Sequence, residues 1–186
     1  MDKLLTSYIR VYKDCLSKEV CETTIKDFDN INWHQANWEE GMSLTKITKP
    51  GEHNRFESYD STSTTDSIMD TMRDCYISYV DSTPFIDGFQ GFCQNKFIKY
   101  GEGSFITEHA DHIHGLFDGE RKGIPVLSAV GLLNNNFEGG EFVMCGDEEI
   151  DLSAGDMLIF PSVFLFPHRV NPIISGIRYS CVTWAW

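Results

Sequence analysis

The chain has 186 residues, of which 41% are hydrophobic and 23% are charged, and this composition excludes an intrinsically disordered protein. The formal net charge is −13 without any run of lysine and arginine, which argues against duplex nucleic acid or an anionic membrane as a partner. A basic polypeptide or a small molecule fits this charge better. No apolar segment approaches the length of a membrane span. A length of 186 residues fits one domain of ordinary size, and we expect a single domain over residues 1–186.

The cysteines indicate a reducing compartment. The six cysteines include no Cys-x-x-Cys pair, and a domain of this length does not depend on disulfides. Residues 1–16 contain neither the continuous apolar core nor the small-residue cleavage site of an export signal. We therefore expect reduced, mostly buried thiols and a cytoplasmic protein.

The first part of the chain, residues 1–90, is expected to contain supporting helices and loops. Residues 17–28 have apolar side chains at helical spacing and a plausible N-cap, Ser17, and thus predict an amphipathic helix. Residues 33–66 show no clear period and end in a Ser/Thr-rich stretch, which is typical of an exposed loop. Within it, the polar segment 50–66 is either a lid over a site or an ordinary loop.

A second helix is predicted over residues 66–80, where an apolar stripe recurs at helical spacing and indicates a core-facing side. From about residue 91 onward the chain is rich in β-branched and aromatic residues, with Gly, Asn and Asp between the segments. The predicted strands lie at residues 92–100, 126–134, 140–145, 156–161 and 177–186. Helices followed by short strands predict an α+β protein, with an antiparallel sandwich or barrel in residues 91–186 and helices on its outer face.

The segment EHADHIHG, residues 108–115, suggests a metal site. In extended chain, side chains two residues apart point to the same side, so His109 and Asp111 share one face. His112 and His114 share the other face, and we interpret them as surface histidines beside an anionic loop. Two histidines and one carboxylate form the facial triad of non-haem iron(II) oxygenases, so His109 and Asp111 require one more histidine from a distant strand.

His168 is the candidate for that third ligand, because it alone among the remaining histidines lies between predicted strands. Ten residues later, Arg178 begins an otherwise apolar strand, and a buried guanidinium is costly unless it meets an anion. A carboxylate would form a bidentate, charge-assisted pair with Arg178. Ser180 faces the same side two residues further on and could donate a further hydrogen bond.

Four segments in this order resemble the iron(II)/2-oxoglutarate-dependent dioxygenases, and among them the prolyl 4-hydroxylase-like group. The segments are YGEGSFITEHAD, LLNNNFEGGEFVM, LSAGDMLIFPS and HRVNPIISGIRYSCVTW, and the resemblance covers roughly residues 92–186. It implies a double-stranded β-helix, or jelly roll, with buttressing N-terminal helices. It also implies that His109, Asp111 and His168 bind Fe(II) and that Arg178 binds the distal carboxylate of 2-oxoglutarate.

The same resemblance assigns further residues to the cosubstrate pocket. Tyr100 corresponds to a family tyrosine and is expected, with Ser180, to contact 2-oxoglutarate. Ile106 replaces a second family tyrosine, and Gly131 stands in the strand where some relatives have another tyrosine that contacts the cosubstrate. The resemblance implies Fe(II) as the cofactor, 2-oxoglutarate and O2 as cosubstrates, and ascorbate as an optional further cofactor.

The implied reaction is hydroxylation of a C–H bond, with release of succinate and CO2, and a prolyl residue in a polypeptide is the first candidate substrate. Two alternatives stay open at this point. One is a cupin-like metal-dependent enzyme of another class, which has no need of Arg178. The other is a non-catalytic jelly-roll module that binds a ligand or partner through its acidic surface.

Overall fold

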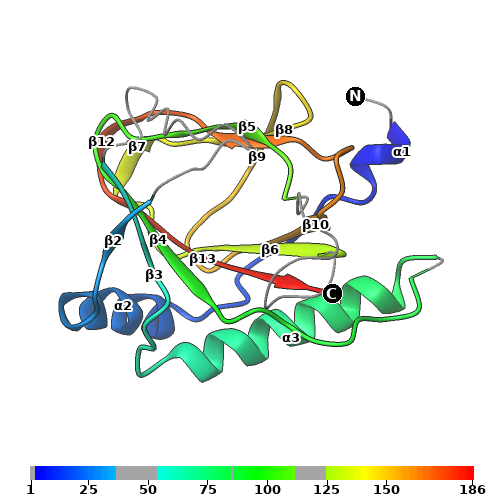
Figure 1. The fold of residues 1–186 in the computed structure, drawn as a ribbon, viewed down its shortest axis with the longest axis horizontal. Coiled ribbons are helices and arrows are strands. Elements are labelled where there is room, and N and C mark those ends of the chain that lie inside the picture. Colours follow the sequence, from blue (N-terminus) through cyan, green and yellow to red (C-terminus); the bar gives the residue numbers. More distant parts are fainter. Residues whose placement is uncertain (1–2, 37–53, 85, 112–124) are drawn as a thin grey trace, which may run out of the picture.

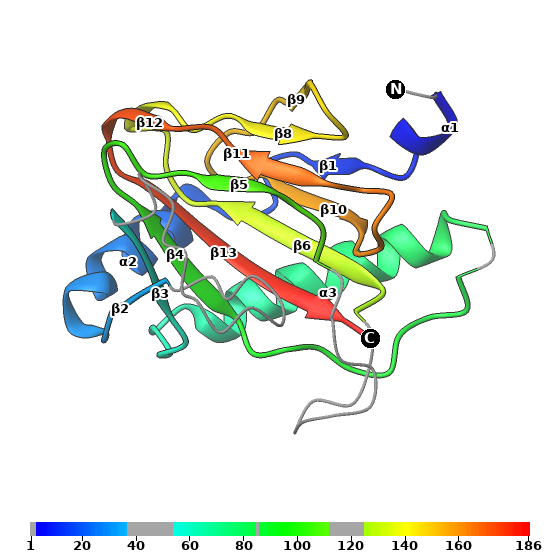
Figure 2. The same ribbon diagram turned by 45° about the horizontal axis from the view of Figure 1, so that its top comes forward.

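The computed structural model describes residues 3–36, 54–84, 86–111 and 125–186, and these form three layers (Figure 1). Helices α2 (Lys18–Asp27) and α3 (Thr65–Asp81) cover one face of a large sheet. A smaller sheet lies across the opposite face (Figure 2). Two short helices, α1 (Lys3–Thr6) and η1 (Phe28–Asn30), complete the helical part of the described residues.

The strands of both sheets pair in antiparallel fashion. The large sheet has seven strands in the order β1-β10-β6-β13-β4-β3-β2. In that order the strands are Arg10–Tyr12, Met157–Pro161, Leu127–Leu132, Arg178–Ala185, Lys96–Tyr100, Arg55–Ser58 and His34–Gln35. The small sheet has the order β5-β11-β8-β9, and β12 pairs separately with β7. These strands are Ile106–His109, His168–Val170, Phe142–Met144, Glu148–Ile150, Ile173–Gly176 and Phe137–Gly139.

Alternation along the central strands produces two apolar cores. On β13, Cys181 is buried in the core shared with the helices, whereas Val182 belongs to the core between the two sheets. On β10, Ile159 and Phe160 divide in the same way. Successive side chains of a strand point to opposite faces, so one buried strand supplies both cores. The polar residues on the inner face of the large sheet are therefore directed toward the small sheet.

Both predicted helices are confirmed, and each of their four ends lies one residue from the predicted position. The Ser17 side chain accepts a hydrogen bond from the backbone N–H of Val20 and so caps α2. In α3 the predicted apolar stripe is largely buried, and Tyr76 is the central contact, because its hydroxyl donates to the carbonyl of Thr183 on β13. The helix is thereby attached to the large sheet by both packing and hydrogen bonding.

The predicted loop over residues 50–66 is wrong in its central part. Arg55–Ser58 forms β3 and pairs with β4 in the large sheet, with Arg55 and Ser58 buried. The short strand was missed because its four residues, Arg-Phe-Glu-Ser, include only one apolar side chain and give no β signal. Residues 50–53, including His53, lie outside the described residues.

The five predicted strands are confirmed, because each predicted segment contains one observed strand, namely β4, β6, β8, β10 and β13. The architecture is the expected double-stranded β-helix. Shorter strands, such as β5 and β11, were not predicted. All six cysteines are free thiols, three of them buried and three half-buried. Within the described ranges, no helix is both long and apolar enough to span a membrane.

Candidate metal centre

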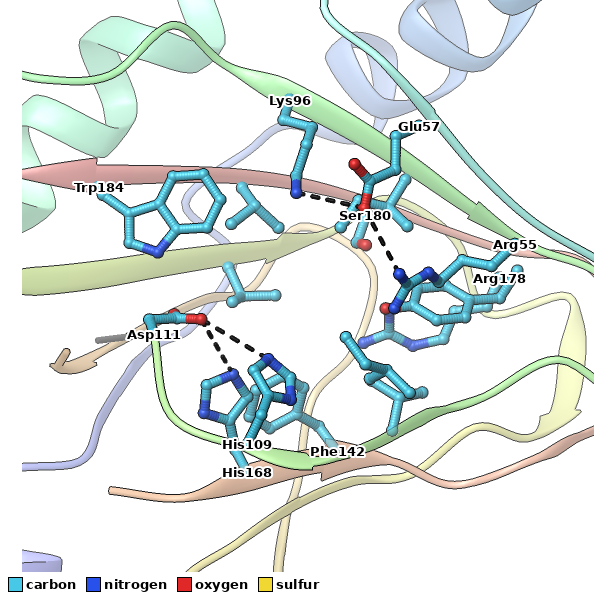
Figure 3. A pocket seen from close by; sticks show the side chains of 16 residues that line it. Arg55, Glu57, Lys96, His109, Asp111, Phe142, His168, Arg178, Ser180 and Trp184 are labelled. Atoms are coloured by element: carbon cyan, nitrogen blue, oxygen red, sulfur yellow. Dashed lines mark ion pairs between the residues drawn. The ribbon is translucent and has the colours of Figure 1, made fainter. Parts of the chain in front are cut away.

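A cavity of about 290 Å³ lies between the two sheets and contains every described residue predicted to act in the site. His109, Asp111 and His168 line it at one end (Figure 3). Arg178 on β13 lines it at the other end, with Ser180 from the same strand (Figure 3). Tyr100 on the neighbouring β4 is the cross-strand partner of Arg178 and also lines the cavity. We refer to these as the iron end and the arginine end.

The iron end brings together one ligand atom from each of the three predicted residues. These three atoms lie within 4.8 Å of one another. Nε2 of His109 and Nε2 of His168 are each 3.6 Å from Oδ1 of Asp111. The arrangement follows from the sheet, because His168 on β11 is the direct cross-strand partner of His109 on β5. Asp111 follows two residues after His109 and returns toward both rings.

The histidine tautomers suit a metal ligand. Nδ1 of His109 is 2.8 Å from the carbonyl oxygen of Thr107, and Nδ1 of His168 is 3.2 Å from that of Phe166. Only a protonated Nδ1 can donate to a carbonyl, so in a neutral ring Nε2 presents its lone pair to the cavity. Backbone acceptors of this kind commonly orient the histidine ligands of metal sites.

Packing further fixes the rings. His168 is buried and stacks on Phe142, with 5.3 Å between ring centroids and 15° between ring planes. The ring of His109 lies 4.3 Å from that of His168. Burial, assisted by the charge of His168, lowers the pKa of His109 to about 4 and so keeps its ring neutral at neutral pH. A neutral ring is the form that binds a metal.

Asp111 is held as an ionised carboxylate. Burial alone would raise its pKa, but His168, His109 and hydrogen bonds from Ser128 and Trp184 outweigh that effect and lower the pKa of Asp111. The Ser128 hydroxyl donates to Oδ2 at 2.7 Å, while Oδ1 faces the two histidines. Nε2 of each imidazole and one carboxylate oxygen therefore face a common point, and this donor set of two histidines and one carboxylate fits Fe(II).

At the arginine end, Arg178 is 2% exposed and its Nε has no hydrogen-bond partner among the described residues. Its guanidinium lies 5.6 Å from the centre of the Tyr100 ring. Burial lowers the pKa of Arg178, although a guanidinium stays protonated at physiological pH. A buried cation with an unused N–H group fits an anionic ligand such as a carboxylate.

The other predicted cosubstrate residues also line the cavity, and their roles stay predictions. Tyr100 is buried beside Arg178. Ser180 lies two residues after Arg178 on β13, and its side chain is on the same face of the strand. Ile106, which replaces the second family tyrosine, lines the cavity as well. Gly131 does not, because a Cβ added there would lie 2.6 Å from Sγ of Cys181 in the helix-side core. Its neighbour Val130 faces the cavity instead.

Among the cavity residues with a polar group, the sequence pattern did not identify four, namely Arg55, Glu57, Lys96 and Trp184. Lys96 and Trp184 lie in predicted strands, and their alternation with buried apolar residues was the available signal. Arg55 and Glu57 lie in the strand that was predicted as loop. His112 and His114 lie outside the described residues, and the exposed His34 is on β2.

Comparison with known proteins agrees with this geometry. Residues 95–186 match the family model of the 2OG-Fe(II) oxygenase superfamily. A PKHD-type hydroxylase of Aliarcobacter butzleri is 29% identical over 161 residues, which are 81% of this chain and 68% of that protein. Another, from Psychrobacter, is 48% identical over 63 residues, which are 31% of this chain and only 24% of that protein.

Among solved structures, the chain is similar to a prolyl hydroxylase of Trichoplax adhaerens in complex with a peptide fragment of the hypoxia inducible factor oxygen degradation domain. The TM-score is 0.69 with 16% identity, over 100% of this chain and 86% of that one. At this identity the similarity shows the fold alone, and it agrees with the double-stranded β-helix formed by the two facing sheets.

Proposed function

The chain belongs to the 2OG-Fe(II) oxygenase superfamily, and from this membership we propose that it hydroxylates a C–H bond of a prolyl residue in a polypeptide. The reaction consumes O2 and 2-oxoglutarate and releases succinate and CO2. Its substrate is the part of the proposal that goes beyond the family.

One observation supports this function above all. A facial triad of metal-ligand atoms and a buried guanidinium line opposite ends of one cavity, so a single small molecule can reach both. A 2-oxo acid with a distal carboxylate has the matching chemistry, with a chelating group at one end and an anion at the other. A cupin-like hydrolase or isomerase has no use for Arg178, and a binding module has no use for the triad.

His109, Asp111 and His168 would hold the iron, and Arg178 would hold the distal carboxylate of 2-oxoglutarate. O2 is the oxidant of the C–H hydroxylation, bound iron would supply its activation, and 2-oxoglutarate would supply two of the electrons that reduce it. The protein residues orient these groups. The backbone carbonyls of Thr107 and Phe166 keep the ligand nitrogens directed at the metal position, and Ser128 and Trp184 hold the carboxylate. The apolar residues Val130, Phe142, Val170 and Val182 also line the cavity and would limit the access of water to the bound groups.

A polypeptide substrate is supported by the names of the similar proteins, which are prolyl hydroxylases or PKHD-type hydroxylases. The net charge of −13 adds a preference, because an anionic surface speeds association with cationic ligands and salt screens this effect. We expect peptides with Lys or Arg near the modified proline to react faster than acidic peptides at low salt. Peptides with a fixed central proline and varied flanking charge would measure the preference, and equal turnover at all salt concentrations would contradict it.

The decisive experiment incubates the protein with Fe(II), 2-oxoglutarate and proline-containing peptides, and measures succinate together with the mass of each peptide. We expect succinate to form and the peptide to gain the mass of one oxygen atom. Succinate without any modified peptide would retain the oxygenase but reject the prolyl substrate. If no succinate forms under any condition, even slowly and without peptide, the proposed function is wrong and one of the two alternatives gains support.

A further inference from the structure

Arg55 is a second buried guanidinium in the cavity, and the proposed function gives it no role. It is 2% exposed, and its Nε and Nη1 have no hydrogen-bond partner among the described residues. Its one ion pair within the described chain is weak, because Nη2 lies 3.9 Å from Oε1 of Glu57. A buried cation in this state is costly unless a ligand completes its hydrogen bonding.

The position of Arg55 relates it to Arg178. Arg55 on β3 is the cross-strand partner of Tyr100 on β4, and Tyr100 is in turn the partner of Arg178 on β13. Residues directly opposite each other in an antiparallel sheet point to the same face. All three line the cavity, and Tyr100 stands between the two arginines in strand order. Figure 3 shows Arg55 and Arg178 side by side at the arginine end.

The charges nearby leave this end positive. Glu57 is the one carboxylate of the described residues that lines the cavity there, and it is shared, because Oε1 is 3.3 Å from Nζ of Lys96 and 3.9 Å from Arg55. The guanidinium groups of Arg55 and Arg178 thus have one carboxylate beside them among the described cavity residues, and that carboxylate is shared with Lys96, whose Nζ also lies 5.1 Å from the centre of the Trp184 ring. The other lining carboxylate, Asp111, is directed at the two histidines of the iron end.

We propose that Arg55 and Arg178 bind the distal carboxylate of 2-oxoglutarate together, as a clamp of two guanidinium groups. A carboxylate has about four lone-pair sites, so one guanidinium does not saturate it. The unused Nε and Nη1 of Arg55 and the unused Nε of Arg178 are the donors that a shared carboxylate would accept from. Tyr100 stands between the two cations, with its ring 5.6 Å from the Arg178 guanidinium and its side chain hydrogen-bonded to Arg55. This inference rests on the proposed function and adds a specificity-determining residue to it.

The clamp predicts strong selectivity for 2-oxo acids that carry a distal carboxylate. The alternative is that Arg55 binds a carboxylate of the substrate to be hydroxylated, and binding measurements without that substrate separate the two. The variants are Arg55→Met, Arg178→Met and the double variant, with Arg73→Met as the control. Arg73 lies on the exposed side of α3, where it pairs with Asp70 far from the cavity.

Affinity for 2-oxoglutarate would be measured by calorimetry on protein loaded with Mn(II) under anaerobic conditions, so that no turnover occurs. The second ligand is 2-oxopentanoate, which has the same chain length without the distal carboxylate. We expect Arg55→Met to weaken 2-oxoglutarate binding by roughly 10- to 100-fold, as for loss of a charge-assisted hydrogen-bonded contact. Binding of 2-oxopentanoate should not weaken, and Arg73→Met should match the parent with both ligands.

The double variant tests whether the two arginines act on one group. Since both would contact the same carboxylate, we expect its loss of affinity to differ from the product of the two single losses. Arg55→Lys keeps the charge but loses the planar fork, and it should retain part of the affinity. This conservative variant also keeps the test valid if Arg55→Met does not fold.

Two results would count against the clamp. Unchanged 2-oxoglutarate affinity in Arg55→Met, beside a clear loss in Arg178→Met, would leave the proposed function standing and reject the role of Arg55. An equal loss for both ligands would show that Arg55 only maintains the shape of the cavity. If the parent protein binds Mn(II) but no 2-oxoglutarate, then the proposed function itself fails.

Discussion

The iron end of the cavity is built from a local motif and one cross-strand pair, whereas the arginine end is assembled from three strands far apart in the sequence. His109 and Asp111 are two residues apart, and His168 completes the triad through the pairing of β11 with β5. Arg55, Tyr100 and Arg178 meet only because β3, β4 and β13 are neighbours in the large sheet. A short motif therefore supplies two of the three candidate metal ligands at one end, and sheet topology brings the two guanidinium groups together at the other.

This difference predicts that the two ends can be disabled independently. The largest effect is expected for His109→Ala, Asp111→Ala and His168→Ala, each of which removes one of three metal ligands and should abolish iron binding and turnover. Iron content after dialysis and succinate formation would be measured. Glu108→Gln is the matched control, since Glu108 is exposed on β5 beside His109 and pairs with Arg169. Iron retained in any of the three alanine variants at the parent level would refute the triad.

At the other end, Arg178→Met should weaken 2-oxoglutarate binding by roughly 30- to 900-fold, which corresponds to about 2–4 kcal/mol for truncation of a buried ion pair. Iron affinity should hardly change, because Arg178 lines the opposite end of the cavity. Calorimetric titration with metal and then with 2-oxoglutarate measures both. A parallel loss of iron affinity would mean that the two ends are not independent. Equal 2-oxoglutarate affinity in Arg178→Met and in the parent would show that another cation binds the distal carboxylate.

A smaller effect is expected for Ser128→Ala, which removes the hydroxyl that donates to Oδ2 of Asp111 at 2.7 Å. Iron affinity should fall by about 10- to 100-fold, as is typical when a group that orients a metal ligand is lost. The affinity for 2-oxoglutarate on the metal-loaded protein should stay close to that of the parent. Ser180→Ala is the matched variant at the arginine end. We expect it to weaken 2-oxoglutarate binding and to leave the affinity for iron close to that of the parent. Identical profiles for these two variants would contradict the division of the cavity.

Asp156 lies outside both ends of the cavity, and its substitution tests stability separately from ligand binding. It is 1% exposed and accepts hydrogen bonds from the backbone N–H groups of Asp14 and Ser153 and from Lys13. Burial would raise its pKa, but these three donors lower the pKa of Asp156. Asp156→Asn should reduce the free energy of unfolding at pH 7 by about 2–3 kcal/mol through lost charge-assisted bonds, with iron and 2-oxoglutarate affinities unchanged.

The pH dependence of that loss follows from the direction of the shift. A carboxyl with a lowered folded pKa stabilises the fold above its unfolded pKa of about 3.9, and this contribution disappears as the pH falls through the folded pKa. The difference between Asp156→Asn and the parent should thus be largest above about pH 4 and shrink below it. Urea unfolding at pH 7 and at acidic pH measures this. Asp151→Asn, an exposed partner of the same lysine, should have little effect.

Much of the iron end was determined by the sequence itself. Side chains two residues apart in extended chain share a face, so His109 and Asp111 could be paired without a structure. His168 was identifiable because it alone among the remaining histidines lies between predicted strands. Arg178 was identifiable because a guanidinium in an otherwise apolar strand needs an anionic partner. The helix capped by Ser17 and the strands β6, β10 and β13 were predictable because their sequence patterns are periodic and local.

The tertiary structure alone decided the remainder of the site. Arg55 and Glu57 lie in a four-residue strand without an apolar pattern, and only its pairing with β4 brings them into the cavity. The direction of Gly131 likewise depends on register, because a shift of one residue along a strand exchanges its two faces. Register between distant strands results from the packing of the whole sheet against the helices and the small sheet, and no local pattern in the sequence encodes it.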